Sequence, residues 1–300
     1  MKLFSRIMRA IQARIYRFNR YRFDHVCWIK TVVYNWLWFG LEGLRKLPIW
    51  IYNDVQILAN GEIVIDGEMH SGMIKMGVWK PKANSKTRWI NNSKVIFHGD
   101  TIIRGGTLFE NTGVVEIGKK VLLSESSRVL CERHITFGDN VSLGFESIVM
   151  DTDFHYVLNV HDMTVKDNKK AISLGAGTWI GGYCKIMKGT NLPPCSIVAS
   201  SSMVNMDYST ESPNTIFAGT PAKPIKTGFR RIHNMEEEWN LYQYFLSHDD
   251  KYHVETVDVE RYCTDNFLKN EYNSIHKIDN KEFAAIFSFS MCKKDKGNAK

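Results

Sequence analysis

A short segment, Asp151 to His155 (DTDFH), holds the residues of this chain that are best suited to proton transfer. A neutral imidazole has a pKa near working pH, so His155 is suited to act as a general base. Asp151 and Asp153 could fix the tautomer of the ring, bind hydroxyl groups of a substrate, or merely cap the turn of a loop. We therefore treat His155 as a candidate base, with Asp153 and Asp151 as candidate catalytic residues beside it.

The sequence that follows this segment repeats every six residues. Aliphatic residues stand at Leu174, Ile180, Ile186, Leu192, Val198 and Val204. A small residue follows four positions after each of the first five, at Thr178, Cys184, Thr190, Ser196 and Ser202. A helix repeats every 3.6 residues and a strand every two, so a period of six predicts a solenoid with three short strands per coil. A run of β-hairpins that falls into phase by accident is the alternative interpretation.

The same period precedes the segment, in three earlier triplets. Their members are Phe97, Ile103 and Phe109; Ile117, Leu123 and Val129; and Phe137, Leu143 and Val149. Each triplet starts twenty residues after the last, which corresponds to three hexapeptides plus two extra residues at one corner. The period then breaks until Leu174, and such interruptions of a regular scaffold often carry function. The sequence thus predicts that His155 lies on a loop, residues 150–173, that leaves the solenoid.

The combination of repeat, loop motif and closing motif resembles the hexapeptide-repeat sugar O-acetyltransferases of the maltose, galactoside and nodulation type, and the acyltransferases of polysaccharide gene clusters. The resemblance rests on DTDFH, GTWIGGYCKIMKG and AGTPAKPIK, and covers roughly residues 95–230. It implies a mainly β fold, a left-handed parallel β-helix. It also implies acetyl-CoA as co-substrate, no metal, and a homotrimer with each site between two subunits.

The resemblance assigns roles to individual residues. His155 would take the proton of a sugar hydroxyl as that hydroxyl attacks the acetyl thioester, without a covalent acyl-enzyme. Glu132 stands where the family has a sugar-binding acid, and Ser124 stands where the family has an asparagine, so the acceptor is left open. The residues that would contact coenzyme A are Trp179, Gly182, Ser200, Asn205, Lys223 and Lys226. Ordinary outward-facing polar residues are the alternative interpretation for Glu132 and Ser124.

The positive charge of the chain is concentrated at its start. The net charge is +7, and residues 1–23 carry seven basic and no acidic residues, which leaves 32 of each sign elsewhere. A body that binds nucleic acid would spread its basic residues, so we expect no nucleic-acid partner. Residues 1–23 are periodic enough for a basic amphipathic helix, and residues 26–41 are too short a run to span a bilayer. Peripheral membrane contact through residues 1–41 is one interpretation, and packing on the protein body is the other.

Six cysteines without a disulfide or metal-type spacing indicate a reduced, cytoplasmic chain, which the basic start could hold at the inner face of the cytoplasmic membrane. We expect three regions: N-terminal helices over residues 1–48, the β-helix over 49–228, and a helical appendage over 229–300 that begins with a helix from Phe229 to Leu246.

The leading hypothesis for function is O-acetylation of a saccharide in surface polysaccharide biosynthesis. The alternatives are N-acylation of an amino sugar, a non-catalytic scaffold, and a zinc enzyme of the carbonic anhydrase type. The last needs three converging histidines, and His98, His134 and His155 lack the expected spacing.

Overall fold

We describe a computed structural model of the chain that covers residues 26–78, 86–254 and 262. The chain divides into two compact units, residues 1–231 and residues 232–300. All the candidate site residues belong to the first unit. The helix predicted over residues 1–23 lies outside the described residues.

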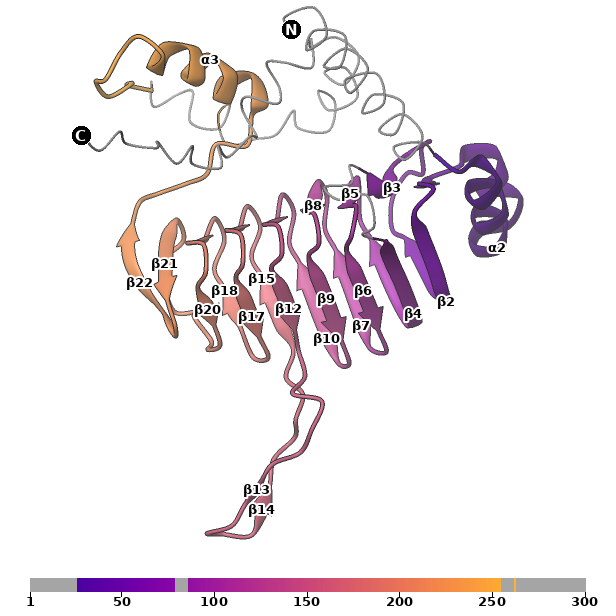
Figure 1. Cartoon of the computed structure of the whole chain (residues 1–300), viewed down its shortest axis with the longest axis horizontal. Coiled ribbons are helices and arrows are strands. Elements are labelled where there is room, and N and C mark those ends of the chain that lie inside the picture. The colour runs from indigo at the N-terminus through magenta and orange to yellow at the C-terminus, as the bar shows by residue number, and fades with distance from the viewer. Residues whose placement is uncertain (1–25, 79–85, 255–261, 263–300) are drawn as a thin grey trace, which may run out of the picture. The chain divides into compact units, whose positions relative to one another are not determined.

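The first unit is a column of stacked coils, and each coil contributes one short strand to each of three faces (Figure 1). The first face holds the second half of β4 (Thr87–Phe97), then β7 (Val114–Ile117), β10 (His134–Phe137), β15 (Ile172–Leu174) and β18 (Asn191–Leu192). The second face holds β1 (Ile49–Ile51), β3 (Ile74–Val78), β5 (Thr101–Arg104), β8 (Val121–Leu123), β11 (Ser142–Leu143), β16 (Trp179–Ile180), β19 (Ile197–Val198), β21 (Thr215–Gly219) and β22 (Ala222–Thr227). The third face holds the first half of β4, then β6 (Leu108–Asn111), β9 (Arg128–Cys131), β12 (Ile148–Met150), β17 (Lys185–Met187) and β20 (Met203–Val204). Strand β2 (Val55–Ile65) pairs along β4.

The predicted interior positions are confirmed. Each of the fifteen aliphatic or aromatic residues of the five triplets is at most 1% exposed. Strands that stack on one another are parallel, with Phe137 beside Ile117 and Leu174 beside Leu192. Burying a side chain of this size stabilises the fold by about 1.5–3 kcal/mol. The predicted fold class, a mainly β parallel β-helix of hexapeptide coils, is therefore confirmed.

The corners explain why a small residue occupies the fourth position after each interior residue. The hydroxyls of Thr178, Thr190 and Ser196 each donate to the backbone carbonyl three residues earlier, at 2.6, 2.7 and 2.6 Å. The residue just before each small one turns through the left-handed region, as at Tyr183 (φ 61°) and Ser201 (φ 63°). All five predicted corner residues are buried, because the chain bends sharply there and leaves room only for a short side chain.

Two of the three corners carry candidate site residues, while Trp179, Lys223 and Lys226 lie on the second face. We name the corner between the third and first faces the loop corner; it holds residues 111–113, 131–133 and 187–190. The corner between the second and third faces is named the Gly182 corner; it holds residues 124–127, 144–147, 181–184 and 199–202. In the coils before the long loop, the loop corner has the two extra residues that the spacing predicted, and the long loop leaves the column there.

Helix α2 (Trp28–Lys46) packs at the N-terminal end of the column. The helix is interrupted at Gly40 (φ 61°) and runs on to Lys46. Gly43 is buried so close to Asn35 that a Cβ atom would lie 2.1 Å from the Asn35 carbonyl oxygen. The glycine therefore permits close packing instead of ending the helix. None of the helices in the described part of the chain has the length and hydropathy that a membrane span requires.

The second unit contains helix α3 (Met235–Phe245). The predicted start of this helix at Phe229 was wrong, because the helix begins at Met235. Asn234 caps the helix, since its side chain accepts hydrogen bonds from the backbone N–H groups of Glu236 and Glu237. An asparagine in this role fixes the first helical residue after it.

Candidate active site

The long loop forms an arm that leaves the loop corner after β12 and returns at β15 (Figure 1). Its two limbs pair at the base. Thr152 and Lys169 form an isolated antiparallel β-bridge there, and the backbone N–H of Asp153 donates to Asn168 O at 2.9 Å. Further out they form the hairpin of β13 (Leu158–Asn159) and β14 (Thr164–Val165). His155 lies between these two pairings, near the base of the arm.

Asp151 is buried at the point where the arm leaves the column, with 0% exposure. Its carboxylate accepts three backbone N–H groups, from Glu132, Arg133 and His134, at 2.8, 2.9 and 2.8 Å. A carboxylate with this set of donors is satisfied by the coil below it. Of the roles that the sequence left open for Asp151, the structure supports the cap of the turn and brings no contact with the His155 ring.

Asp151 ends a row of buried side chains that stack on one another along the loop corner. The other members are Cys131, Asn111 and Asn91, each twenty residues before the next. Asn111 Nδ2 donates to Asn91 Oδ1 at 2.8 Å, and Cys131 Sγ lies 3.4 Å from Asp151 Oδ2. Burial, followed by the nearby Asp151 charge, raises the pKa of the Cys131 thiol well above its usual range. Cys131 is therefore a protonated donor to Asp151 and no nucleophile.

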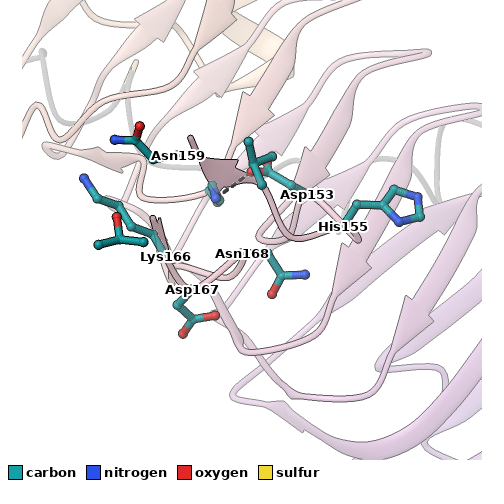
Figure 2. Close-up of a pocket in the computed structure, with 9 residues that line it drawn as sticks. Asp153, His155, Asn159, Lys166, Asp167 and Asn168 are labelled. Carbon is teal, nitrogen blue, oxygen red and sulfur yellow. Dashed lines mark ion pairs between the residues drawn. The ribbon is translucent and has the colours of Figure 1, made fainter. Parts of the chain in front are cut away.

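Asp153 is bound to a lysine of the next coil. Its carboxylate lies 2.6 Å from Lys188 Nζ. Figure 2 shows the imidazole of His155 directed away from this carboxylate. The prediction that Asp151 or Asp153 orients the ring is thus not met within one chain, because backbone groups hold the first carboxylate and Lys188 holds the second.

The imidazole of His155 is exposed. Its own backbone N–H donates to Asp153 O at 2.7 Å, and the preceding Phe154 has φ 60°. Phe154 N donates to Thr152 Oγ1 at 2.9 Å. These bonds form a tight turn that holds the His155 backbone in place while its side chain stays accessible to a substrate.

A polar pocket of about 270 Å³ opens between the limbs of the arm (Figure 2). Its lining includes Asp153, His155, Asn159, Lys166 and Asn168. Asn168 is 5% exposed, and its Oδ1 atom has no hydrogen-bond partner in the described part of the chain. This oxygen has almost no accessible surface, so the pocket contacts other atoms of Asn168.

Glu132 lies at the base of the arm. Its Oε2 atom is 3.0 Å from Lys169 Nζ and accepts the Thr152 hydroxyl at 3.1 Å. The hydrogen bond to Glu132 raises the pKa of Lys169. Ser124 lies at the Gly182 corner, so the structure does not bring the two predicted acceptor residues together within one chain. Their roles in substrate binding stay predictions.

Three of the predicted coenzyme A residues lie close together. Trp179 faces outward from the second face, is 38% exposed, and carries the guanidinium of Arg231 at 5.0 Å from its ring centre. Gly182 and Ser200 follow at the adjoining Gly182 corner, on successive coils. A Cβ atom on Gly182 would lie 2.8 Å from the Phe145 ring, so this glycine permits close packing.

The other three coenzyme A residues are more scattered. Lys223 and Lys226 are exposed on β22, which continues the second face beyond Trp179. Asn205 is exposed after β20, at the loop corner. Two cations on the same face as Trp179 are a suitable arrangement for phosphate groups, whereas Asn205 lies on another side of the column.

His98 and His134 lie on the first face. Both rings approach Glu116, at 3.9 and 3.0 Å, while His155 is on the arm. Within the described ranges, no group of three or more histidine, cysteine or acidic side chains could hold a metal ion. The three histidines of the zinc hypothesis therefore do not converge in one chain.

Sequence reasoning missed Lys188, Arg231 and Asn168. Each is an ordinary polar residue whose importance comes from a contact across coils or across the arm. The six-residue period places Lys188 on the outside of the column, but it does not show that the arm brings Asp153 to it.

No protein-family model matches the chain. A curated relative from Schizosaccharomyces pombe, named "Putative acetyltransferase", is 27% identical over 118 residues, 37% of this chain and 52% of the relative. The chain thus spans about half the length of this relative.

The crystal structure of the polySia-specific acetyltransferase NeuO aligns with a TM-score of 0.49 at 19% identity, over 67% of this chain and 84% of that one. A hexapeptide-repeat-containing acetyltransferase from Vibrio cholerae O1 biovar eltor, complexed with acetyl coenzyme A, aligns with a TM-score of 0.37 at 24% identity, over 44% of this chain and 70% of that one. Each of these three proteins is named as an acetyltransferase.

Proposed function

We propose that this chain is an acetyl-CoA-dependent O-acetyltransferase that modifies a saccharide hydroxyl in surface polysaccharide biosynthesis. The observation that carries the proposal is the accessible His155 imidazole beside a polar pocket, on the one arm that interrupts the described column. The curated acetyltransferase relative supports the same reaction.

In the proposed reaction the acceptor hydroxyl lies in the pocket and His155 takes its proton. The oxygen attacks the thioester carbonyl carbon, and the tetrahedral intermediate collapses with cleavage of the C–S bond. The imidazolium returns the proton to the departing coenzyme A thiolate. The atoms balance without an acyl-enzyme, so the step needs no nucleophilic cysteine.

The geometry of one chain separates the two halves of this site. The arm leaves the loop corner, and the face opposite that corner of the column is the second face, which carries Trp179. A thioester held along Trp179 could therefore reach His155 only from another copy of the chain. We accordingly propose a homotrimer in which each site lies between neighbouring subunits, since a heterologous contact that closes into a ring has this form.

We propose a cytoplasmic location for the reaction. The four cysteines in the described ranges, Cys27, Cys131, Cys184 and Cys195, are free thiols, which suits a reducing compartment.

The decisive experiment measures the release of coenzyme A thiol from acetyl-CoA with a panel of oligosaccharides and matched amino sugars. We expect turnover with hydroxyl acceptors and a loss of at least about a hundredfold for His155→Ala, the typical effect of removing a general base. His161→Ala, on the same arm, is the matched control and should retain activity. Transfer only to amino acceptors would favour N-acylation, and no binding of coenzyme A in calorimetry would favour a scaffold.

A further inference from the structure

Helix α2 exposes many of its large apolar side chains, and its inner side combines polar residues with the partly buried Tyr34, Trp38 and Phe39, which pack against the core. Its fully buried side chains are polar: Thr31 and Asn35 are both 0% exposed. Large apolar side chains cover its outer side instead, namely Trp28, Ile29, Val32, Val33, Trp36, Leu37, Leu41 and Leu44, each between 37% and 79% exposed.

The inward polar stripe is specific. Asn35 Nδ2 donates to Ile49 O at 2.7 Å, and its Oδ1 accepts Ile49 N at 3.0 Å. Thr31 Oγ1 accepts Ile51 N at 3.1 Å. These bonds satisfy the edge of β1, which is the last strand at this end of the second face in the described part of the chain. The helix is thereby held with its apolar side outward, and it cannot roll over to bury that side without breaking these bonds.

The outer side of α2 also lacks charge over three turns. Between Thr31 and Leu41 the sequence contains no charged residue, and Lys30 Nζ is directed to the carbonyls of Asn53 and Val55. Exposed apolar surfaces of this extent mark interaction sites. The two exposed tryptophans have the side chain type that is enriched at the boundary between lipid and water.

The charge of the neighbouring sequence indicates the partner. Residues 1–23 carry seven basic and no acidic residues, and Asp24 and three uncharged residues separate them from α2. Arg45 and Lys46 end the helix, where Lys46 pairs with Glu42 at 3.1 Å. Basic residues near an anionic bilayer surface each contribute about 1 kcal/mol of binding. An apolar surface on a chain whose preceding sequence is strongly basic is complementary to anionic lipid, whose headgroups are negative and whose interior is apolar.

We propose that the outer side of α2 docks this protein on the surface of an anionic lipid bilayer, with the helix lying in the plane of the interface. This inference is independent of the acetyl transfer reaction. It accounts for the polar inward stripe of α2, which the transfer site does not use.

The test is flotation of the full-length protein with vesicles of phosphatidylglycerol and phosphatidylcholine in equal parts, and with vesicles of phosphatidylcholine alone. We expect binding to the anionic vesicles and at least about tenfold weaker binding to the neutral ones. The triple variant Trp36→Glu, Leu37→Glu, Leu41→Glu should reduce binding to the anionic vesicles at least about tenfold. Val160→Glu, at an apolar position of the arm that is 70% exposed, is the matched control and should bind as the parent does.

Thermal unfolding and sedimentation velocity distinguish the other possible occupants of the surface. For a lipid-binding surface, the triple variant keeps the melting temperature and the subunit number of the parent. A lower melting temperature of the triple variant, with no vesicle binding by the parent, would mean that another segment of the chain covers α2. A smaller assembly of the triple variant, with no vesicle binding by the parent, would mean that a second copy covers it. Either result, or equal binding of parent and triple variant, overturns the proposal.

Discussion

The Asp153 carboxylate and the Lys188 ammonium group lie 2.6 Å apart, and this pair joins the first turn of the arm to the coil that follows it. The carboxylate nearest in sequence to His155 is therefore directed to the column. In one chain the candidate base is held by its backbone turn alone, and its ring is free to meet an acceptor or a neighbouring subunit.

Replacing Lys188 tests what this pair does. Lys188→Met should change the unfolding free energy by less than about 1 kcal/mol, because both side chains of the pair are partly exposed. If the released Asp153 turns to His155, its negative charge favours the imidazolium, and the lower limb of the pH profile of kcat/KM should move to higher pH. An unchanged profile would show that Asp153 stays away from the ring. Lys185→Met, on strand β17 just before Lys188, is the control.

Asp151 should be structural. Asp151→Asn keeps the size of the side chain but introduces donors that face backbone N–H groups, so we expect the free energy of unfolding to fall by about 2–4 kcal/mol. Denaturant unfolding measures this directly. Asp162→Asn, at an exposed position on the arm, should change stability far less. If the Asp151→Asn variant has parental stability but no activity, Asp151 takes part in catalysis instead.

Asn168 lines the pocket proposed for the acceptor. Asn168→Ala changes the shape of that pocket, and we expect KM for the saccharide to rise about fivefold or more while KM for acetyl-CoA is unchanged. Initial rates at varied concentrations of each substrate separate the two. Asn159→Ala, whose exposed side chain caps the turn at His161, is a control on the same pocket. Equal rises in both KM values would indicate a general distortion of the arm.

Mixing two inactive variants tests the proposed division of the site between subunits. His155→Ala and Trp179→Ala chains are denatured together in equal amounts and refolded, and the mixture should regain about a quarter of parental activity. In random assembly half of the sites contain an intact histidine from one subunit, and half of those contain an intact tryptophan from the neighbouring subunit. Each variant refolded alone should remain inactive. If the mixture also remains inactive while assembled, the two residues act within one chain or in different processes.

Cys131 should make stability depend on alkaline pH. Burial raises the pKa of this thiol far above its ordinary value of 9.0, so above pH 9 the unfolded chain loses a proton that the folded chain keeps. The folded state then binds more protons, and its stability should fall as pH rises, by up to about 1.4 kcal/mol per pH unit from this group. The difference in unfolding free energy between the parent and Cys131→Ala should therefore shrink above pH 9. Cys195→Ala, at a half-buried site, is the comparison.

The amino-acid sequence by itself determined the column and the point at which the arm leaves it. An interior residue every sixth position is a burial requirement that each coil meets separately, so the repeat could be read directly at Leu174, Ile180 and Ile186. The extra pair of residues per coil likewise marked the loop corner, and the break after Val149 marked the arm.

Only the tertiary structure decided what individual polar residues do. Asp151 and Asp153 look equivalent in sequence, yet one is buried against the coil below and the other is paired with Lys188 of the coil above. The composition of α2 is apolar around most of the helix, and only its bonds to Ile49 and Ile51 determine which side faces outward. The physical reason is the same in each case: hydrogen bonds and ion pairs depend on groups that stacking or packing brings together from distant parts of the chain, whereas burial of an apolar side chain follows from its own position in the repeat.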